Sequence, residues 1–245
     1  PEEALTVLVK VNSEAEGQSI LEEIKQSVNN TESGRLLSFG WLVIIIGILL
    51  SVFQQFVGIN VVLYYAPEIF KTVSSGTDSA LLMTIIVGVV NFLFTIIAIK
   101  TVDKYGRKPL MLIGAIGMGV AMLSLGFVFF SHASGYFALF CMMLYVASFA
   151  MSWGPVTWVL LSEIFPNKIR GKALAIAVAA QWISNYLVSL TFPMMNDNSY
   201  LTEQFNHGFA YWVYGIMCIL AVLFVKKYVP ETKGKTLEEM ENIWK

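Results

Sequence analysis

The sequence predicts an all-α membrane protein that crosses the bilayer six times. Of its 245 residues, 56% are hydrophobic and 13% are charged, and the mean hydropathy is +0.67. Soluble domains are typically about 45–50% apolar and about 25% charged, so this composition excludes an ordinary soluble domain. The charged residues also lie between long neutral stretches, and a helix needs roughly 20 such residues to cross a hydrocarbon core of about 30 Å.

Five neutral stretches provide the six predicted spans. They lie at residues 36–67, 79–99, 109–162, 173–196 and 204–225. Four of them hold one helix each, whereas the stretch at 109–162 is about twice as long as one crossing needs. The small and polar residues in the middle of that stretch, at 131–135, are typical of a turn. We therefore expect two helices there, joined by this turn.

Two of the predicted spans are interrupted. Gly58 breaks the apolar run of the first span, and neutral amides surround it. Gly154 and Pro155 stand inside the fourth span, where a proline removes a backbone donor and bends the helix. An interrupted helix that carries polar residues is typical of the binding site of a membrane transporter.

The positions of the basic residues predict the orientation of the chain. Six spans place both termini on the same side of the membrane. Of the 16 Lys and Arg residues, all except Lys71 fall in segments on that side. Because cytoplasmic segments carry the excess of Lys and Arg, we expect both termini in the cytoplasm.

Charge and hydropathy also divide the chain into three regions. They are a cytoplasmic linker at 1–35, a six-helix transmembrane domain at 36–228 and a cytoplasmic tail at 229–245. In the linker, apolar residues recur every four positions at Ile20, Ile24 and Val28. This spacing predicts an amphipathic helix.

The polar residues within the predicted spans are neutral and form a group on at least three helices. They are Gln54, Gln55, Asn60, Tyr64, Tyr65, Asn91, Trp158, Gln181, Trp182 and Asn185. A buried amide without a partner costs about 1–3 kcal/mol, so these side chains are expected to face one another or a wet cavity. A single amide is equally well explained as a contact between helices. As a group, amides that donate and accept, together with flat aromatic faces, suit the hydroxyls and C–H groups of a sugar.

Other functional classes find little support. An ion pathway or proton relay needs a carboxylate or His deep in a span, whereas Glu68, Asp103 and Glu163 lie at span ends. The sequence has no Ser-His-Asp order, HExxH spacing or glycine-rich phosphate loop, so we expect no enzyme, metal site or cofactor. Cys141 and Cys218 lie in apolar runs and are expected to be buried. The formal net charge of −1 gives no indication of a nucleic-acid partner.

Charged residues at two of the cytoplasmic connections form a second candidate group. Asp103 and Arg107 belong to the short turn at 103–108, and Glu163 and Arg170 flank the connection after the fourth span. They are either the ordinary basic flanks of membrane helices or an ion-pair latch that stabilises one access state. Because they recur at two equivalent connections, we favour the latch.

Four short strings occur together in this sequence. They are QQFVGIN at 54–60, DKYGRK at 103–108, SEIFP at 162–166 followed by IRG at 169–171, and PETKG at 230–234. Together they resemble the sugar porter family of the major facilitator superfamily. The resemblance covers residues 36–245 and corresponds to the C-terminal six-helix half of a twelve-helix transporter.

The resemblance implies a site and a mechanism. The residues that would contact the sugar are Gln54, Gln55, Asn60, Tyr64, Asn91, Trp158, Gln181 and Trp182. The implied substrate is D-xylose, with glucose as a competitor, imported with protons by alternating access across the bacterial inner membrane. The proton would be carried by an N-terminal six-helix half that this sequence lacks, and the first residue, Pro1, is consistent with a fragment.

Two alternatives remain open at this point. The same half could belong to a facilitative uniporter for hexoses or pentoses. It could also be a truncated fragment that binds sugar without transporting it.

Overall fold

The computed structural model describes residues 2–11, 13–14, 16–18, 20–22, 36, 39–73, 77–132, 135–235, 239–240 and 243–244. Within these ranges the regular structure is helical. The helices are α1 (Glu2–Val11), α3 (Trp41–Phe56), α4 (Ile59–Val73), α5 (Thr77–Tyr105), α6 (Arg107–Phe130), α7 (Gly135–Met151), α8 (Trp153–Ile164), α9 (Arg170–Asn196), α10 (Ser199–Phe205) and α11 (Phe209–Tyr228).

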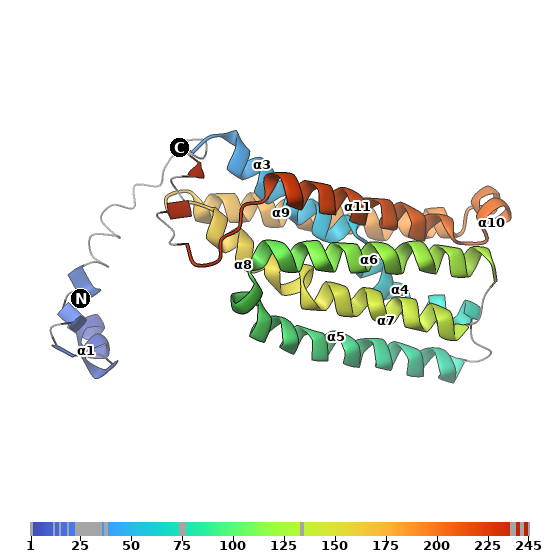
Figure 1. The fold of residues 1–245 in the computed structure, drawn as a ribbon, viewed down its shortest axis with the longest axis horizontal. Coiled ribbons are helices and arrows are strands. Elements are labelled where there is room, and N and C mark those ends of the chain that lie inside the picture. The colour runs from blue at the N-terminus through green and yellow to red at the C-terminus, as the bar shows by residue number, and fades with distance from the viewer. Residues whose placement is uncertain are drawn as a thin grey trace.

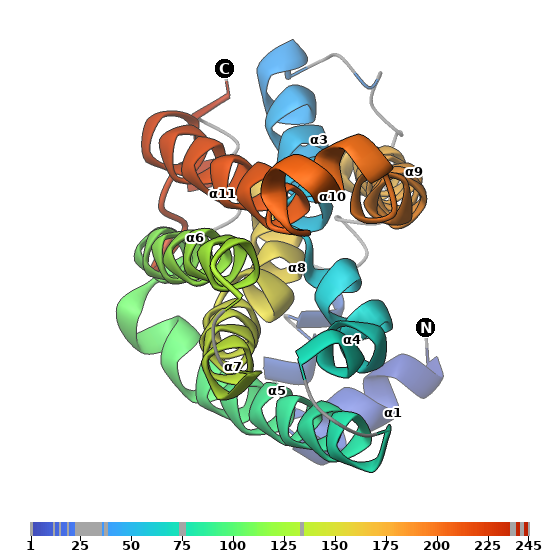
Figure 2. The same cartoon turned by 90° about the vertical axis from the view of Figure 1, so that its right-hand side faces the viewer.

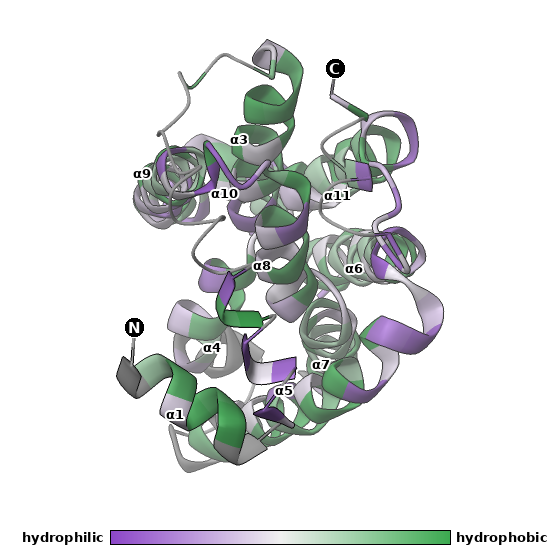
Figure 3. Ribbon diagram, turned by 90° about the vertical axis from the view of Figure 1, so that its left-hand side faces the viewer, coloured by the Kyte–Doolittle hydropathy of each residue, from purple (hydrophilic) through white to green (hydrophobic). Residues whose placement is uncertain are grey.

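Within the described residues, six helical segments are long and apolar enough to cross a membrane, as the sequence predicts. They are Trp41–Pro67, Leu81–Tyr105, Arg107–Phe130, Tyr136–Ile164, Arg170–Asn196 and Phe209–Tyr228. Figure 1 shows them side by side in one bundle, with the α5–α6 connection and the carboxyl terminus at one end and α10 at the other. Seen from the first of these ends, the helices are mostly hydrophobic and the connections are hydrophilic (Figure 3).

The predicted boundary of the sixth span is wrong at its start. The neutral stretch begins at residue 204, but α11 begins at Phe209, because residues 199–205 form the separate helix α10. The side chain of Asn198 caps α10 by accepting the Leu201 N–H at 3.1 Å. The helix ends at Phe205, because the next residue, Asn206, has a φ of 46° in the left-handed region that stops a helix. The first span likewise begins at Trp41 and not at residue 36.

The two interrupted spans lie at the centre of the bundle and the second span lies at its edge. In the most apolar part of the first and fourth spans, 61% of residues are buried, against 11% in the second. Viewed along the helices, α3 and α8 lie between the other spans while α5 forms one side (Figure 2). The central position of α3 and α8 brings their interruptions close to each other.

The interruption of the first span lies at Gly58, as predicted. Helix α3 ends at Phe56 and α4 begins at Ile59. Gly58 has a φ of 95°, a conformation that glycine adopts readily because it lacks a Cβ. The new helix starts with the Val62 N–H donating to the Gly58 carbonyl at 3.2 Å. The span therefore consists of two helices that are joined by Val57 and Gly58.

The interruption of the fourth span lies at Ser152, three residues before the predicted proline. Helix α7 ends at Met151 and α8 begins at Trp153, so Pro155 falls in the first turn of α8. A proline is tolerated there, because the N–H groups of a first turn have no partner within the helix. In a continuous helix the nitrogen of Pro155 would have to donate to the Met151 carbonyl, which it cannot do.

Cys141 and Cys218 are buried and free, as expected. Of the amphipathic pattern in the linker, Ile24 and Val28 lie outside the described residues.

Large apolar side chains on the outer faces of the bundle, such as Phe92 and Phe127, are exposed. Such faces suit contact with lipid.

Candidate functional site

Gln55 joins the two halves of the interrupted first span to α9. Its Oε1 accepts hydrogen bonds from Asn60 Nδ2, on α4, and from Asn185 Nδ2, on α9, the latter at 3.3 Å. Its Nε2 donates to Gln54 Oε1 at 3.4 Å. The amides that the sequence singles out in α3 and α4 therefore form one network, with Asn185 as a further member.

Gln54 connects this network to the second interruption. Its Nε2 donates to the Trp153 carbonyl at 3.0 Å and to the Gly154 carbonyl at 3.4 Å. Both acceptors lie in the first turn of α8, and the Gln54 side chain is 3% exposed. Its amide nitrogen is engaged with the protein, so Gln54 is the most enclosed of the predicted sugar contacts.

Gln181 has an acceptor that the protein does not satisfy. It lies on α9 one turn before Asn185, and its side chain is 7% exposed. Its Oε1 is buried and has no hydrogen-bond partner among the described residues. An unpaired buried acceptor is unfavourable, and in membrane proteins it is a common sign of a ligand or water position. A hydroxyl group of a ligand would satisfy it.

The predicted aromatic contacts are exposed side chains. Trp158 on α8 is 44% exposed, Tyr64 on α4 is 58% exposed and Trp182 on α9 is 62% exposed. Asn91, on α5, is partly buried, and within the described residues it makes no hydrogen bond to the amide network. The structure thus brings together the amides of α3, α4 and α9, and it leaves these four side chains without a direct bond to them.

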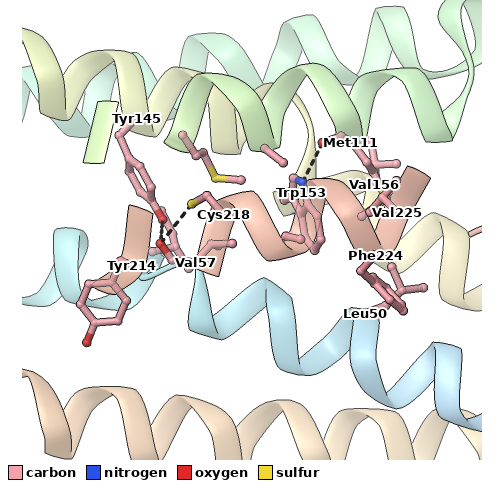
Figure 4. Packing of buried hydrophobic residues seen from close by; sticks show 14 of the residues in the cluster. Leu50, Val57, Met111, Tyr145, Trp153, Val156, Tyr214, Cys218, Phe224 and Val225 are labelled. Carbon is pink, nitrogen blue, oxygen red and sulfur yellow. Dashed lines mark hydrogen bonds between the residues drawn. The ribbon is translucent and has the colours of Figure 1, made fainter. Parts of the chain in front are cut away.

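Three side chains that support the network were not predicted as site residues. Tyr65 donates to the Ser189 carbonyl on α9 at 3.2 Å. Tyr145 donates to the Val57 carbonyl at 2.8 Å, and Trp153 Nε1 donates to the Met111 carbonyl at 2.9 Å (Figure 4). Tyr65 belongs to the polar group noted in the sequence. Tyr145 and Trp153 carry no such signal, because a Tyr or Trp in an apolar run is usually a packing residue.

At the end of the bundle opposite to α10, Arg107 pairs with two acidic residues. Its Nη2 and Nε lie 2.7 Å and 3.1 Å from the two carboxylate oxygens of Glu163, which is a bidentate arrangement. Its Nη2 also lies 3.0 Å from Asp103 Oδ1. The connection between α5 and α6 is thereby fixed to the end of α8.

The carboxyl-terminal segment completes this charged group. The Glu231 carboxylate accepts backbone N–H groups of Arg107 and Lys108 at 3.0 Å each, at the start of α6. Negative charge is favourable at a helix N-terminus. The Thr232 hydroxyl donates to Glu163 Oε2 at 2.5 Å. Glu231 and Thr232 belong to a string noted in the sequence, but neither was predicted as a functional residue.

Arg170 does not join these pairs. Its Nε donates to the Phe165 carbonyl at 3.2 Å, and its Nη2 is buried without a partner among the described residues. Of the four residues predicted to form a latch, the structure therefore brings together Asp103, Arg107 and Glu163. Their gating role stays a prediction.

Comparisons with known proteins identify the family. The sequence model of the sugar (and other) transporter family matches residues 1–244. The chain belongs to this family. It is 62% identical over 245 residues to the D-xylose-proton symporter of Escherichia coli strain K12, covering 99% of this chain and 50% of that protein. It is 45% identical to the glucose facilitated diffusion protein of Zymomonas mobilis, covering 99% of this chain and 52% of the relative.

Solved structures agree with this assignment. The proton:xylose symporter XylE of the major facilitator superfamily, bound to 6-bromo-6-deoxy-D-glucose, matches with a TM-score of 0.86 and 62% identity, covering 100% of this chain and 52% of that chain. The inward-open conformation of the E. coli xylose transporter XylE matches with a TM-score of 0.79 and 57% identity, covering 100% of this chain and 50% of that chain. The chain thus spans about half the length of its relatives, and its fold is the C-terminal six-helix half of a major facilitator bundle.

Proposed function

We propose that this chain forms the sugar-binding half of a transporter that imports D-xylose together with protons. The observation that carries the proposal is the amide network around Gln55, whose member Asn185 follows Gln181 by one turn of α9, together with the unsatisfied acceptor of Gln181. Neutral groups that donate and accept match the hydroxyls of an uncharged sugar. The 62% identity to a D-xylose-proton symporter makes xylose the first substrate to test.

Within the proposed site, the amides and the aromatic residues have different roles. Gln55, Asn60 and Gln181 bind hydroxyl groups, and Asn91 adds a further amide from α5. The exposed faces of Trp158, Trp182 and Tyr64 cover the C–H face of the sugar. Gln54 contributes mainly by tying the network to α8, because its nitrogen already binds two carbonyl groups.

Proton coupling is assigned to the missing N-terminal half. A proton carrier needs a group whose charge changes inside the membrane, and within the described spans the carboxylates of Asp103 and Glu163 lie at the helix ends. The two halves would rock about the central site, with both termini in the cytoplasm and the transporter in the bacterial inner membrane. The charged residues Asp103, Arg107, Glu163 and Arg170 would stabilise one access state.

Facilitative uniport is the second candidate. It is favoured by the 45% identity to a glucose facilitated diffusion protein. The sugar contacts in this half would serve either mechanism equally well. The substrate would then be glucose or another hexose, and only the concentration gradient of the sugar itself would drive uptake.

Uptake into proteoliposomes with an imposed pH gradient, acid outside, tests the proposal. The full-length protein that contains this chain should accumulate labelled xylose above the external concentration, and a protonophore should abolish the accumulation. Residues 1–245 alone should accumulate none, because one wall of the cavity is open to lipid. Equilibration without accumulation would favour uniport. Uphill accumulation by residues 1–245 alone would contradict the assignment of proton coupling to the N-terminal half.

A further inference from the structure

Among the described residues, the Val57 carbonyl at the interruption of the first span has no backbone N–H donor. Helix α4 begins with the bond from Val62 N–H to the Gly58 carbonyl, at 3.2 Å. The Gly58 N–H turns back to the Gln55 carbonyl at 2.9 Å. The Val57 carbonyl, between these two bonds, is therefore left to side-chain donors. Val57 is fully buried, so bulk water cannot satisfy its carbonyl.

Two side chains from other helices converge on this carbonyl. The Tyr145 hydroxyl, from α7, donates to it at 2.8 Å, and Cys218 Sγ, from α11, lies 4.0 Å away (Figure 4). A thiol is a weak donor, so the phenol provides the main bond. Tyr145 is fully buried, and its hydroxyl has this carbonyl as its partner.

The bond from Tyr145 runs opposite to the bond from Gln54. Tyr145 belongs to the fourth span and binds the interruption of the first, whereas Gln54 belongs to the first span and binds the carbonyl groups just after the interruption of the fourth. The first and fourth spans are thus joined near their interruptions by one bond from Tyr145 and two from Gln54. Asn60 follows the first interruption directly, so its side chain depends on the direction in which α4 leaves it.

From this arrangement we infer that Tyr145 is a positioning residue for the sugar site. By binding the Val57 carbonyl, its hydroxyl sets the angle between α3 and α4 and so places Asn60 against Gln55. Among the described residues Tyr145 makes no hydrogen bond to the amides of the network, so it acts through the backbone. This role rests on the proposed sugar site, and nothing in the pattern of the sequence indicates it.

The test compares Tyr145→Phe with the matched control Tyr211→Phe in the full-length protein. Both residues are buried tyrosines, and both substitutions remove one oxygen. Tyr211, on α11, stacks on Phe129 with ring centroids 4.9 Å apart and has no bond to Val57. Loss of one hydrogen bond that orders a site should weaken xylose binding about three- to tenfold in Tyr145→Phe, measured by calorimetry on folded protein. The control should change the Kd less than about twofold.

A measurement without sugar examines the interruption itself. Hydrogen–deuterium exchange of the amides at 58–62 should become faster in Tyr145→Phe and remain unchanged in Tyr211→Phe. Unchanged exchange in Tyr145→Phe would overturn the inference whether or not the protein binds xylose. Faster exchange with an unchanged xylose Kd would also overturn it, because Tyr145 would then support the fold without placing the site.

A double-mutant cycle identifies the route by which Tyr145 acts. If it acts by placing Asn60, the weakening caused by Tyr145→Phe should largely disappear in an Asn60→Ala background. In a Gln181→Ala background it should persist, because Gln181 lies on α9 and not on the interrupted span. Equal weakening in both backgrounds would contradict the route through α4. If the unmodified protein binds no xylose, the proposed function is wrong, and the exchange measurement still decides whether Tyr145 holds the interruption.

Discussion

Gln181 differs from the other amides of the site because its hydrogen bonding is incomplete. Gln54 and Gln55 both form hydrogen bonds to other protein groups, so replacing either would remove contacts within the protein as well as contacts with a ligand. The Oε1 of Gln181 has no such partner. A substitution there removes an acceptor that no described protein group uses, which makes Gln181 the most informative single residue.

At the residue scale, Gln181→Ala should weaken xylose binding several-fold. A hydrogen bond to a neutral ligand is worth about 0.5–1.5 kcal/mol, or up to about tenfold in Kd. Calorimetry on the full-length protein measures this. The control is Gln204→Ala, which removes an exposed amide on α10 and should leave the Kd unchanged. An unchanged Kd for Gln181→Ala would place the sugar elsewhere.

At the scale of the element, the site depends on the interruptions of two helices. The α3–α4 interruption requires a positive φ at Gly58, and the same residue is packed closely. A Cβ added at Gly58 would lie 2.9 Å from Cγ of the Tyr214 ring. Conformation and packing therefore both select glycine at this position.

Gly58→Ala should consequently destabilise the protein. A left-handed conformation costs a residue with a Cβ about 1–2 kcal/mol, and the clash with Tyr214 adds to this cost. Thermal unfolding in detergent measures the loss. Gly88→Ala is the matched control, because Gly88 lies inside α5 with nothing within 4 Å of an added Cβ. There alanine should be neutral or stabilising, since it favours a helix by about 1 kcal/mol over glycine. Equal melting temperatures for the two variants would refute the argument.

At the scale of the whole molecule, the charged group lies at the end of the bundle opposite to α10. Within the described residues, Arg107 connects the α5–α6 turn to α8 through Glu163, and Glu231 connects it to the carboxyl-terminal segment. Exposed ion pairs contribute only about 0–1 kcal/mol each, and in this group Asp103 is exposed whereas Arg107 and Glu163 are partly buried. A network of them can nevertheless shift an equilibrium between two access states that differ by a few kcal/mol.

Glu163→Gln should therefore suppress active uptake of xylose while leaving equilibrium binding largely intact. The substitution keeps the shape of the side chain and removes the charge that pairs with Arg107. Proteoliposome uptake and calorimetry on the same preparation separate the two effects. Glu203→Gln, at an exposed position on α10, is the control and should transport normally. Normal uptake by Glu163→Gln would reduce this residue to a structural contact.

The sequence by itself determined the number of spans, the position of the first interruption and the group of neutral amides. These features depend on local properties: the length of apolar runs, the conformational freedom of Gly58 and the rarity of amides in hydrocarbon. The sequence placed the second interruption at Pro155, three residues after its position at Ser152 in the structure. A proline is accepted in the first turn of a helix, so the sequence alone does not show that α8 already begins at Trp153.

Only the tertiary structure decided which of these residues meet. Gln54 and Trp153 are 99 positions apart, Tyr145 and Val57 are 88 apart, and Arg107 and Glu231 are 124 apart. No local pattern pairs residues at such separations, because their contact depends on how α3, α7, α8 and the carboxyl-terminal segment pack. For the same reason, only the structure shows that Arg170 binds the Phe165 carbonyl and that Tyr145 has its partner at the interruption.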